Sequence, residues 1–141
     1  MKRLSAHVLV VDDFEQWRRL VRKALEKEGL HVIGEAADGP EALQKAEELQ
    51  PDLIVLDISL PTLNGIEVAR KTKTLAPKSK VVFLTQNDSR DFADAAFGDG
   101  ASGYVLKSAM RELIPTVKAV LQGRQSSGLG LEALRFGPET V

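Results

Sequence analysis

The chain has 141 residues, of which 43% are hydrophobic, enough for one domain with a core of its own. Its 19 lysines and arginines nearly balance its 20 aspartates and glutamates, and the net charge of -1 argues against binding to nucleic acid or to an acidic membrane by this chain alone. The chain has no cysteine, which excludes a disulfide framework and a thiolate metal site. The first apolar run ends at Asp12 and is too short for a signal peptide or a membrane span, so we expect a cytoplasmic protein.

Short apolar runs alternate with helical patterns along the chain. Such runs, rich in β-branched residues, predict buried strands. We expect strands at residues 7–11, 31–36, 53–56, 80–84 and 103–106. Strands that alternate with helices in this way indicate an α/β fold, in which a parallel sheet has right-handed crossovers and helices on both faces.

The helical patterns each place their apolar residues on one side. The first predicts a stripe facing the core, made of Phe14, Trp17, Leu20, Val21, Ala24 and Leu25. The second begins near Pro40 and ends at Pro51, and the third and fourth follow Gly65 and Asp88. Pro115 lies in the fifth pattern, so we expect that helix to start late or to bend there.

Polar residues stand where four of the predicted strands end. They are Asp12 and Asp13 after the first strand, Asp57 after the third, Thr85 after the fourth and Lys107 after the fifth. The carboxyl ends of parallel strands meet at one edge of the sheet, where binding and catalytic groups collect. We therefore expect three carboxylates, one hydroxyl and one ammonium group to converge there.

Three neighbouring carboxylates need a cation to remain ionised, because two unit charges about 4 Å apart repel by roughly 4 kcal/mol at an effective dielectric of about 20. Oxygen ligands without a nearby histidine or cysteine favour a hard divalent ion, and Mg²⁺ is the abundant candidate. A carboxylate beside Mg²⁺ and an ammonium group can accept a phosphoryl group, because both cations neutralise charge on the transferring oxygens. The predicted nucleophile is Asp57, with Lys107 as the ammonium group.

Four separated motifs together resemble the receiver domain of two-component response regulators. They are the Asp12–Asp13 pair after a strand, DISLPTLNGIEVAR beginning at Asp57, VVFLT ending at Thr85 and GASGYVLKS containing Lys107. The resemblance covers residues 7 to about 122 and implies a flavodoxin-like, doubly wound (βα)5 fold with strand order 2-1-3-4-5. It also implies a phosphorylation-dependent signalling switch that takes its phosphoryl group from a sensor histidine kinase or a phosphotransfer protein. Such a protein is no enzyme beyond catalysing its own phosphorylation and dephosphorylation.

The resemblance assigns metal-binding roles to four residues. Asp57 is the phosphoacceptor, and Asp13 and Asp57 bind Mg²⁺ directly. Asp12 acts largely through water, and the backbone carbonyl of Ser59 is a further ligand.

The resemblance also implies a relay from the acceptor to a distant surface. The hydroxyl of Thr85 turns to the phosphoryl group, and the ring of Tyr104 moves inward into the vacated space. The relay changes the surface formed by the fourth helix, the fifth strand and the fifth helix. A homodimer would form through that surface or through the first and fifth helices.

Two positions depart from the pattern of the family. Gln86 stands where receivers usually have a small residue, and Ser108 follows Lys107 where proline is common. We expect Ser59, Gln86 and Asn87 to tune access of water to the phosphoryl group.

The segment SGYVLKSAMRELIPTVKAVLQG is most similar to receivers of the nitrate-regulator type, which precede a helix-turn-helix output domain in transcription regulators. We expect a receiver domain over residues 1–122. Residues 123–141 are predicted to be a linker or tail without an output domain, because they begin rich in glycine and serine. The chain is then either a single-domain regulator or the receiver portion of a longer protein.

Three other functions share parts of this pattern. An aspartyl-phosphate hydrolase of the haloacid dehalogenase kind needs a second aspartate two residues after the nucleophile, where this chain has Ser59. A flavodoxin-type FMN carrier needs a phosphate-binding loop after the first strand, where two carboxylates would repel a phosphate. A receiver-like module that binds proteins without phosphorylation is the remaining alternative.

Overall fold

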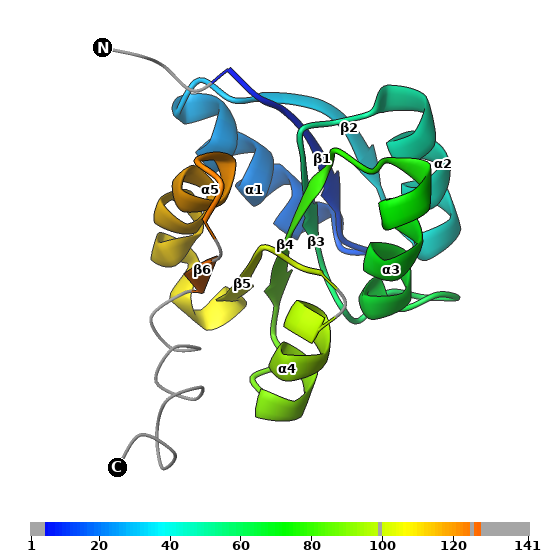
Figure 1. Ribbon diagram of the computed structural model, residues 1–141. Helices are drawn as coiled ribbons and strands as arrows, with labels where there is room; N and C mark the ends of the chain where they lie inside the picture. Colours follow the sequence, from blue (N-terminus) through cyan, green and yellow to red (C-terminus); the bar gives the residue numbers. More distant parts are fainter. Residues whose placement is uncertain (1–4, 99, 125, 128–141) are drawn as a thin grey trace, which may run out of the picture.

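The computed structural model describes residues 5–98, 100–124 and 126–127, and Figure 1 shows a sheet between two helical layers. The elements in chain order are β1 (His7–Val11), α1 (Glu15–Lys27), β2 (His31–Ala36), α2 (Gly39–Leu49), β3 (Leu53–Leu56), α3 (Gly65–Leu75), β4 (Lys80–Thr85), α4 (Arg90–Gly98), β5 (Gly103–Leu106), the 3-10 helix η1 (Lys107–Glu112), α5 (Leu113–Leu121) and β6 (Ser126–Ser127). All pairings are parallel, and the strand order is β2-β1-β3-β4-β5-β6. The first five strands thus have the predicted order.

Alternation along each strand divides the core into two layers. Val8 and Val10 of β1 pack in the layer that contains α1 and α5, whereas Leu9 and Val11 pack in the layer that contains α2, α3 and α4. Figure 1 shows the same division, with α1 and α5 on one side of the sheet and α2 and α3 on the other. Because side chains alternate in a strand, the residue that follows each strand faces the same side as the residue two positions before it.

The predicted strands form where the apolar runs indicated. Four have the predicted bounds, and β4 extends one residue further, to Thr85. β6 was not predicted; it pairs with β5, with Gly103 opposite Ser126 and Tyr104 opposite Ser127. Most of the predicted linker or tail, residues 123–141, lies outside the described residues.

The predicted stripe of α1 is partly wrong. Val21 and Leu25 are buried, but Phe14 is 57% exposed and Leu20 is 47% exposed. Phe14 precedes the helix in an extended conformation, so helical periodicity does not place its side chain. Leu20 lies next to Val21 in the sequence, about 100° around the helix, and therefore points away from the row that packs on the sheet.

Pro115 is accommodated as the sequence led us to expect. The 3-10 helix η1 follows β5 directly, and α5 begins only at Leu113. Pro115 therefore lies in the first turn of α5, where its missing N–H removes no helical hydrogen bond.

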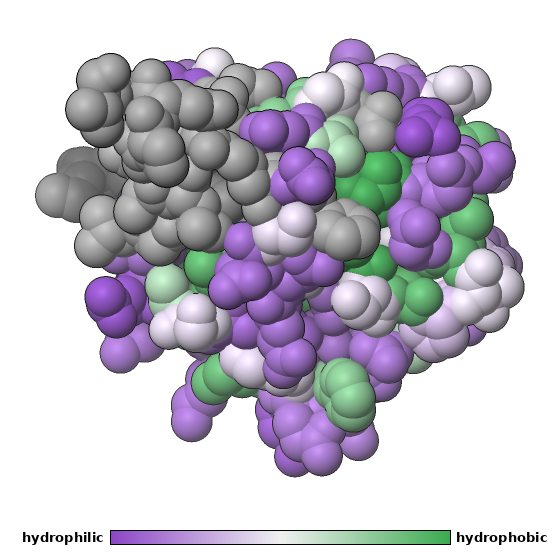
Figure 2. All heavy atoms as spheres, turned by 90° about the horizontal axis from the view of Figure 1, so that it is seen from below, coloured by the Kyte–Doolittle hydropathy of each residue, from purple (hydrophilic) through white to green (hydrophobic). Residues whose placement is uncertain are grey.

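The surface seen from below in Figure 2 is mainly hydrophilic, with apolar side chains in separate groups among polar ones. In the part of the chain that the structure describes, no helix is both long enough and apolar enough to cross a membrane.

Candidate functional site

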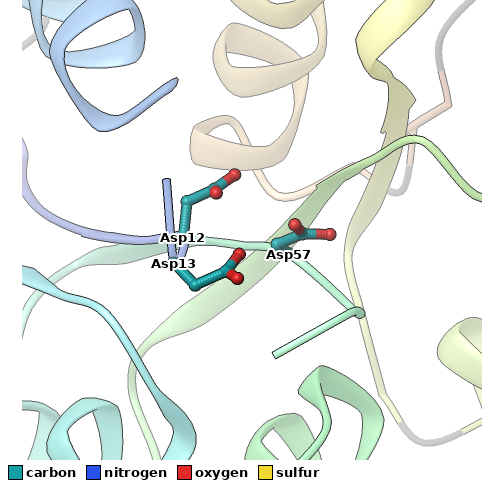
Figure 3. Close-up of side chains that lie close together, drawn as sticks. All are labelled: Asp12, Asp13 and Asp57. Carbon is teal, nitrogen blue, oxygen red and sulfur yellow. The ribbon is translucent and has the colours of Figure 1, made fainter. Parts of the chain in front are cut away.

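Three carboxyl groups meet at the carboxyl ends of β1 and β3. Val11 pairs with Leu56, so the residues that follow them, Asp12 and Asp57, leave the sheet at the same level. One carboxylate oxygen from each of Asp12, Asp13 and Asp57 lies within 4.8 Å of the other two. Figure 3 shows the three side chains close to one another, with Asp12 and Asp13 at one strand end and Asp57 at its neighbour. The structure thus confirms that adjacent parallel strands bring these acids into one cluster.

Lys107 enters the cluster from β5 and holds two of its members. Its Nζ lies 2.7 Å from Asp12 Oδ2 and 3.1 Å from Asp57 Oδ2, and its side chain is only 4% exposed. Side-chain alternation explains why these groups meet. Val10, Val55 and Val105 all face the side of α1 and α5, and the residues two positions after them face the same side. Those residues are Asp12, Asp57 and Lys107. Charges in so little solvent attract much more strongly than on a surface.

Each acid has a different set of partners. Asp12 Oδ1 accepts a hydrogen bond of 2.9 Å from the Phe14 N–H, and Asp57 Oδ1 accepts one of 3.3 Å from the Ser59 N–H. Asp13 Oδ1 is buried and has no hydrogen-bond partner among the described residues. A buried carboxylate oxygen without a donor is unfavourable unless a cation faces it.

A divalent cation fits this donor set. Three carboxylates against one ammonium group leave two negative charges, and the ligand atoms are all oxygens, as Mg²⁺ prefers. The unpartnered Oδ1 of Asp13 belongs to the same group. The residues present therefore suit Mg²⁺, which Asp12, Asp13 and Asp57 would hold.

Burial raises the pKa of Asp12 above its ordinary value, although hydrogen bonds from Lys107 and from the Phe14 N–H act in the opposite direction. The raised pKa means that protons compete for the Asp12 oxygens at a higher pH than for an exposed aspartate. Metal binding to this cluster should consequently weaken as the pH falls toward the carboxylate range.

Thr85 and Tyr104 lie on the other side of the sheet and are joined through the backbone of Asn87. Both are fully buried. Thr85 Oγ1 accepts a hydrogen bond of 3.2 Å from the Asn87 N–H, and the Tyr104 hydroxyl donates one of 2.8 Å to the Asn87 carbonyl. Burial, and to a lesser extent the charges of Asp57 and Asp88, raises the pKa of Tyr104 well above its ordinary value, so the hydroxyl remains a donor.

The three residues expected to tune the pocket differ in exposure. Ser59 and Gln86 are exposed, whereas Asn87 is partly buried. The Asn87 side chain is engaged, because its Oδ1 accepts a hydrogen bond of 2.9 Å from the Ser89 N–H. Ser108, the second departure from the pattern of the family, is exposed at the start of η1.

Two residues near the cluster were not predicted as part of it. Trp17, expected in the core, presents its ring to Lys107, with Nζ 4.7 Å from the ring centroid. Arg18 donates to the Asp12 backbone carbonyl at 2.7 Å and to Glu35 at 2.9 Å. The position of Trp17 one turn after the aspartate pair was the available signal, because the first turn of that helix starts beside the strand end.

Comparison with known proteins places the chain among signalling proteins. The family model described as the response regulator receiver domain matches residues 8–118. Response regulator GacA of Pseudomonas viridiflava is 36% identical over 120 residues, which cover 84% of this chain and 56% of GacA. The virulence-factor transcription regulator BvgA of Bordetella pertussis is 40% identical over 117 residues, 82% of this chain and 56% of BvgA. The chain thus spans about half the length of these relatives.

Solved structures agree with this placement. A two-component response regulator of the LuxR family from Aurantimonas sp. SI85-9A1 superposes with a TM-score of 0.93 at 32% identity, covering 98% of this chain and 100% of that one. The signal receiver domain of NarL from Mycobacterium tuberculosis gives a TM-score of 0.80 at 30% identity, covering 85% of this chain and 98% of that one.

Proposed function

The chain belongs to the response regulator receiver domain family, and from that premise we propose that Asp57 accepts a phosphoryl group in a Mg²⁺-dependent reaction. The observation that carries the proposal is the position of Asp57, which shares the acid cluster with Asp12 and Asp13 and bonds Lys107 at 3.1 Å. The donor would be the phosphohistidine of a sensor histidine kinase or a phosphotransfer protein.

In the transfer, an oxygen of the Asp57 carboxylate attacks phosphorus, the new O–P bond forms, and the bond from phosphorus to the donor breaks with its electron pair. Lys107 is already oriented at Asp57 Oδ2 and supplies a positive charge beside the phosphoryl oxygens. The N–H of Ser59 bonds the other oxygen, Oδ1, which orients the carboxylate plane. Mg²⁺ bound by Asp12, Asp13, Asp57 and the Ser59 carbonyl would supply further neutralisation of charge on the transferring group.

We propose further that Thr85 and Tyr104 relay the phosphorylation state. A hydroxyl that accepts one hydrogen bond still has a proton to donate, so Thr85 can bond a phosphoryl oxygen while it contacts Asn87. Movement of Thr85 would alter the Asn87 backbone and hence the hydrogen bond to Tyr104. The Tyr104 ring is buried and lies near Phe83 and Phe97, at ring-centroid distances of 6.0 and 6.4 Å.

Gln86 is proposed to set the lifetime of the phosphoryl group. Hydrolysis needs a water in line with the acyl phosphate, and each tenfold change in rate corresponds to about 1.4 kcal/mol. Because the amide oxygen of Asn87 is engaged with Ser89, the long exposed side chain of Gln86 is the better candidate to shield that approach. Ser59 is exposed and short and would leave its side of the pocket open.

The biological output is proposed to be control of transcription. BvgA is a transcription regulator, and the match covers 56% of it. We propose a receiver unit over residues 1–122 and a linker or tail over 123–141, acting in the cytoplasm. Homodimerisation through α4, β5 and α5, or through α1 and α5, would connect phosphorylation to that output.

The test is the intact mass of the chain after incubation with acetyl phosphate and Mg²⁺. We expect a gain of one phosphoryl group by the parent, no gain by Asp57→Asn, and no gain by either protein in excess chelator. Asp52→Asn is the matched control, because Asp52 precedes β3, the strand that Asp57 follows, and binds the His7 N–H at the opposite end. A parent that stays unlabelled although it binds Mg²⁺ would support the protein-binding module instead.

A further inference from the structure

Lys107 has three contacts, two with carboxylates and one with an aromatic ring. Two of its contacts are the carboxylates of Asp12 and Asp57. The third is the ring of Trp17, whose centroid lies 4.7 Å from Nζ, within the range of a cation–π interaction. Among the described residues, Lys107 is the one cation within hydrogen-bond distance of the acid cluster. The indole of Trp17 therefore faces that cation.

The geometry of α1 explains why a residue expected in the core lies here. Trp17, Val21 and Leu25 are spaced by four residues and form one row on the helix. Val21 and Leu25 pack on the sheet, whereas Trp17 is in the first turn, beside the end of β1, and is only partly buried. One row of α1 thus supplies both core residues, Val21 and Leu25, and a residue that contacts the site, Trp17.

A buried lysine needs such a contact. Its ammonium group sits on a flexible four-carbon chain, and its transfer from water is unfavourable unless every side is satisfied. The π face of an indole attracts a cation without forming a directional bond, so it leaves the N–H groups free to choose their acceptors. A carboxylate in the same place would instead bind Lys107 and draw it away from Asp57.

We propose that Trp17 is a positioning residue that holds the Lys107 ammonium at Asp57 and excludes water from the side that the ring faces. The inference rests on the proposed function, because it assigns a residue to the phosphoryl transfer at Asp57. During transfer Lys107 exchanges its bond to Asp57 Oδ2 for one to a phosphoryl oxygen. The indole limits how far Nζ moves while that exchange takes place.

The first test detects the contact itself and needs no phosphorylation. Protons above an aromatic ring resonate upfield, so the Lys107 side-chain methylene next to Nζ should be shifted upfield in the parent, with the signal assigned by its loss in Lys107→Met. We expect Trp17→Leu to abolish this shift and Trp17→Phe to retain part of it. An unshifted Lys107 signal in the parent would overturn the proposal.

The second test measures the initial rate of labelling by acetyl phosphate with saturating Mg²⁺. We expect Trp17→Leu to label about three- to tenfold more slowly, the range of an exposed to partly buried cation–π contact, and Trp17→Phe to recover most of the rate. Leu20→Ala, at an exposed position of the same helix, should label at the parent rate. Thermal melts of all variants check that each is folded.

A double-mutant cycle separates positioning from packing. If Trp17 acts through Lys107, Trp17→Leu should have no further effect on labelling in the Lys107→Met background. An equal slowing in both backgrounds, or a parent rate in Trp17→Leu, would overturn the proposal. A parent that is not labelled at all would instead refute the proposed function, and the upfield shift would show that the contact itself exists.

Discussion

The three acids of the cluster are all aspartates, but their carboxylates have different hydrogen-bond and ion-pair partners. Asp12 and Asp57 each bond Lys107 and a backbone N–H. Asp13 has a buried Oδ1 without a partner among the described residues, so its charge is the least compensated of the three. Asp13 should therefore lower the stability of the metal-free chain, although it is needed to bind the metal.

Asp13→Asn should make the metal-free chain more stable and deprive it of stabilisation by Mg²⁺. Removing one of the three carboxylate charges, whose oxygens lie within 4.8 Å of one another, relieves repulsion at an effective dielectric of about 20, and we expect this to raise the free energy of unfolding by roughly 1 kcal/mol after losses elsewhere. The parent should gain stability as Mg²⁺ is added, because the ion binds the folded state. Urea unfolding with chelator and with Mg²⁺ measures both effects.

Asp52→Asn is the control for that measurement, since Asp52 is at the opposite end of β3 and should leave the Mg²⁺ gain intact. If Asp13→Asn were stabilised by Mg²⁺ as much as the parent, the ion would bind elsewhere.

At the level of elements, an ionic cluster joins α1 to β2 next to the acid site. Glu35 of β2 accepts hydrogen bonds from Arg18 at 2.9 Å and from Arg22 at 2.8 Å. Arg18 also donates to the Asp12 carbonyl, so this cluster fixes the start of α1 relative to the end of β1. Although partial burial alone would raise the pKa of Glu35, the hydrogen bonds and charges of Arg22 and Arg18 outweigh it and lower that pKa.

Glu35→Gln should therefore lose stability at neutral pH and regain parity with the parent in acid. A carboxyl group whose pKa is lower in the folded state contributes stability above its unfolded value of 4.5, and this contribution disappears as the pH falls through the lower, folded value. We expect a loss of about 1 kcal/mol at pH 7 for this partly buried pair of contacts.

Urea unfolding of parent and variant from pH 7 to pH 3 is the measurement. Glu26→Gln removes an exposed partner of the same Arg22 and should have a smaller effect. A difference between Glu35→Gln and the parent that stayed constant over this range would show that packing, and not the charge of Glu35, stabilises the junction.

The sequence predicted the elements better than the faces they present. Apolar runs located β1 to β5, and the strands other than β2 are nearly all apolar because both of their faces are buried. It failed for Phe14 and Leu20, since periodicity alone does not fix where a helix starts or how wide its buried row is. β6 has only two residues and pairs through its backbone, which leaves no pattern in the sequence.

The residues of the candidate site could also be predicted in part. Asp12, Asp13, Asp57 and Lys107 follow strands, and strand ends converge in any parallel sheet, so their proximity could be predicted. The ring of Trp17 over Lys107 depends on how α1 crosses the strand end, which is a tertiary property.

For the molecule as a whole, the residues of the proposed chemistry and those of the proposed relay lie on opposite sides of the sheet. Lys107 and Trp17 are on the side of α1 and α5, where the proposed chemistry is supported. Tyr104 packs with Phe83 on the side of α2, α3 and α4, and Thr85, two residues after Phe83 on β4, follows the same alternation. On the second side, the hydrogen bonds of Thr85 and Tyr104 to the Asn87 backbone connect the site to the segment that leads into α4.

Thr85→Ala should consequently separate phosphorylation from its structural effect. The variant keeps Asp57, the other acids and Lys107, so we expect it to be labelled by acetyl phosphate. A bound group shifts a conformational equilibrium only through contacts that differ between the two states, and the proposed contact is the Thr85 hydroxyl on a phosphoryl oxygen. Phosphorylation should then change hydrogen exchange in residues 88–122 of the parent and of Thr85→Ser, which keeps the hydroxyl, but hardly in Thr85→Ala. A response in Thr85→Ala as large as in the parent would mean that another group couples Asp57 to α4 and β5.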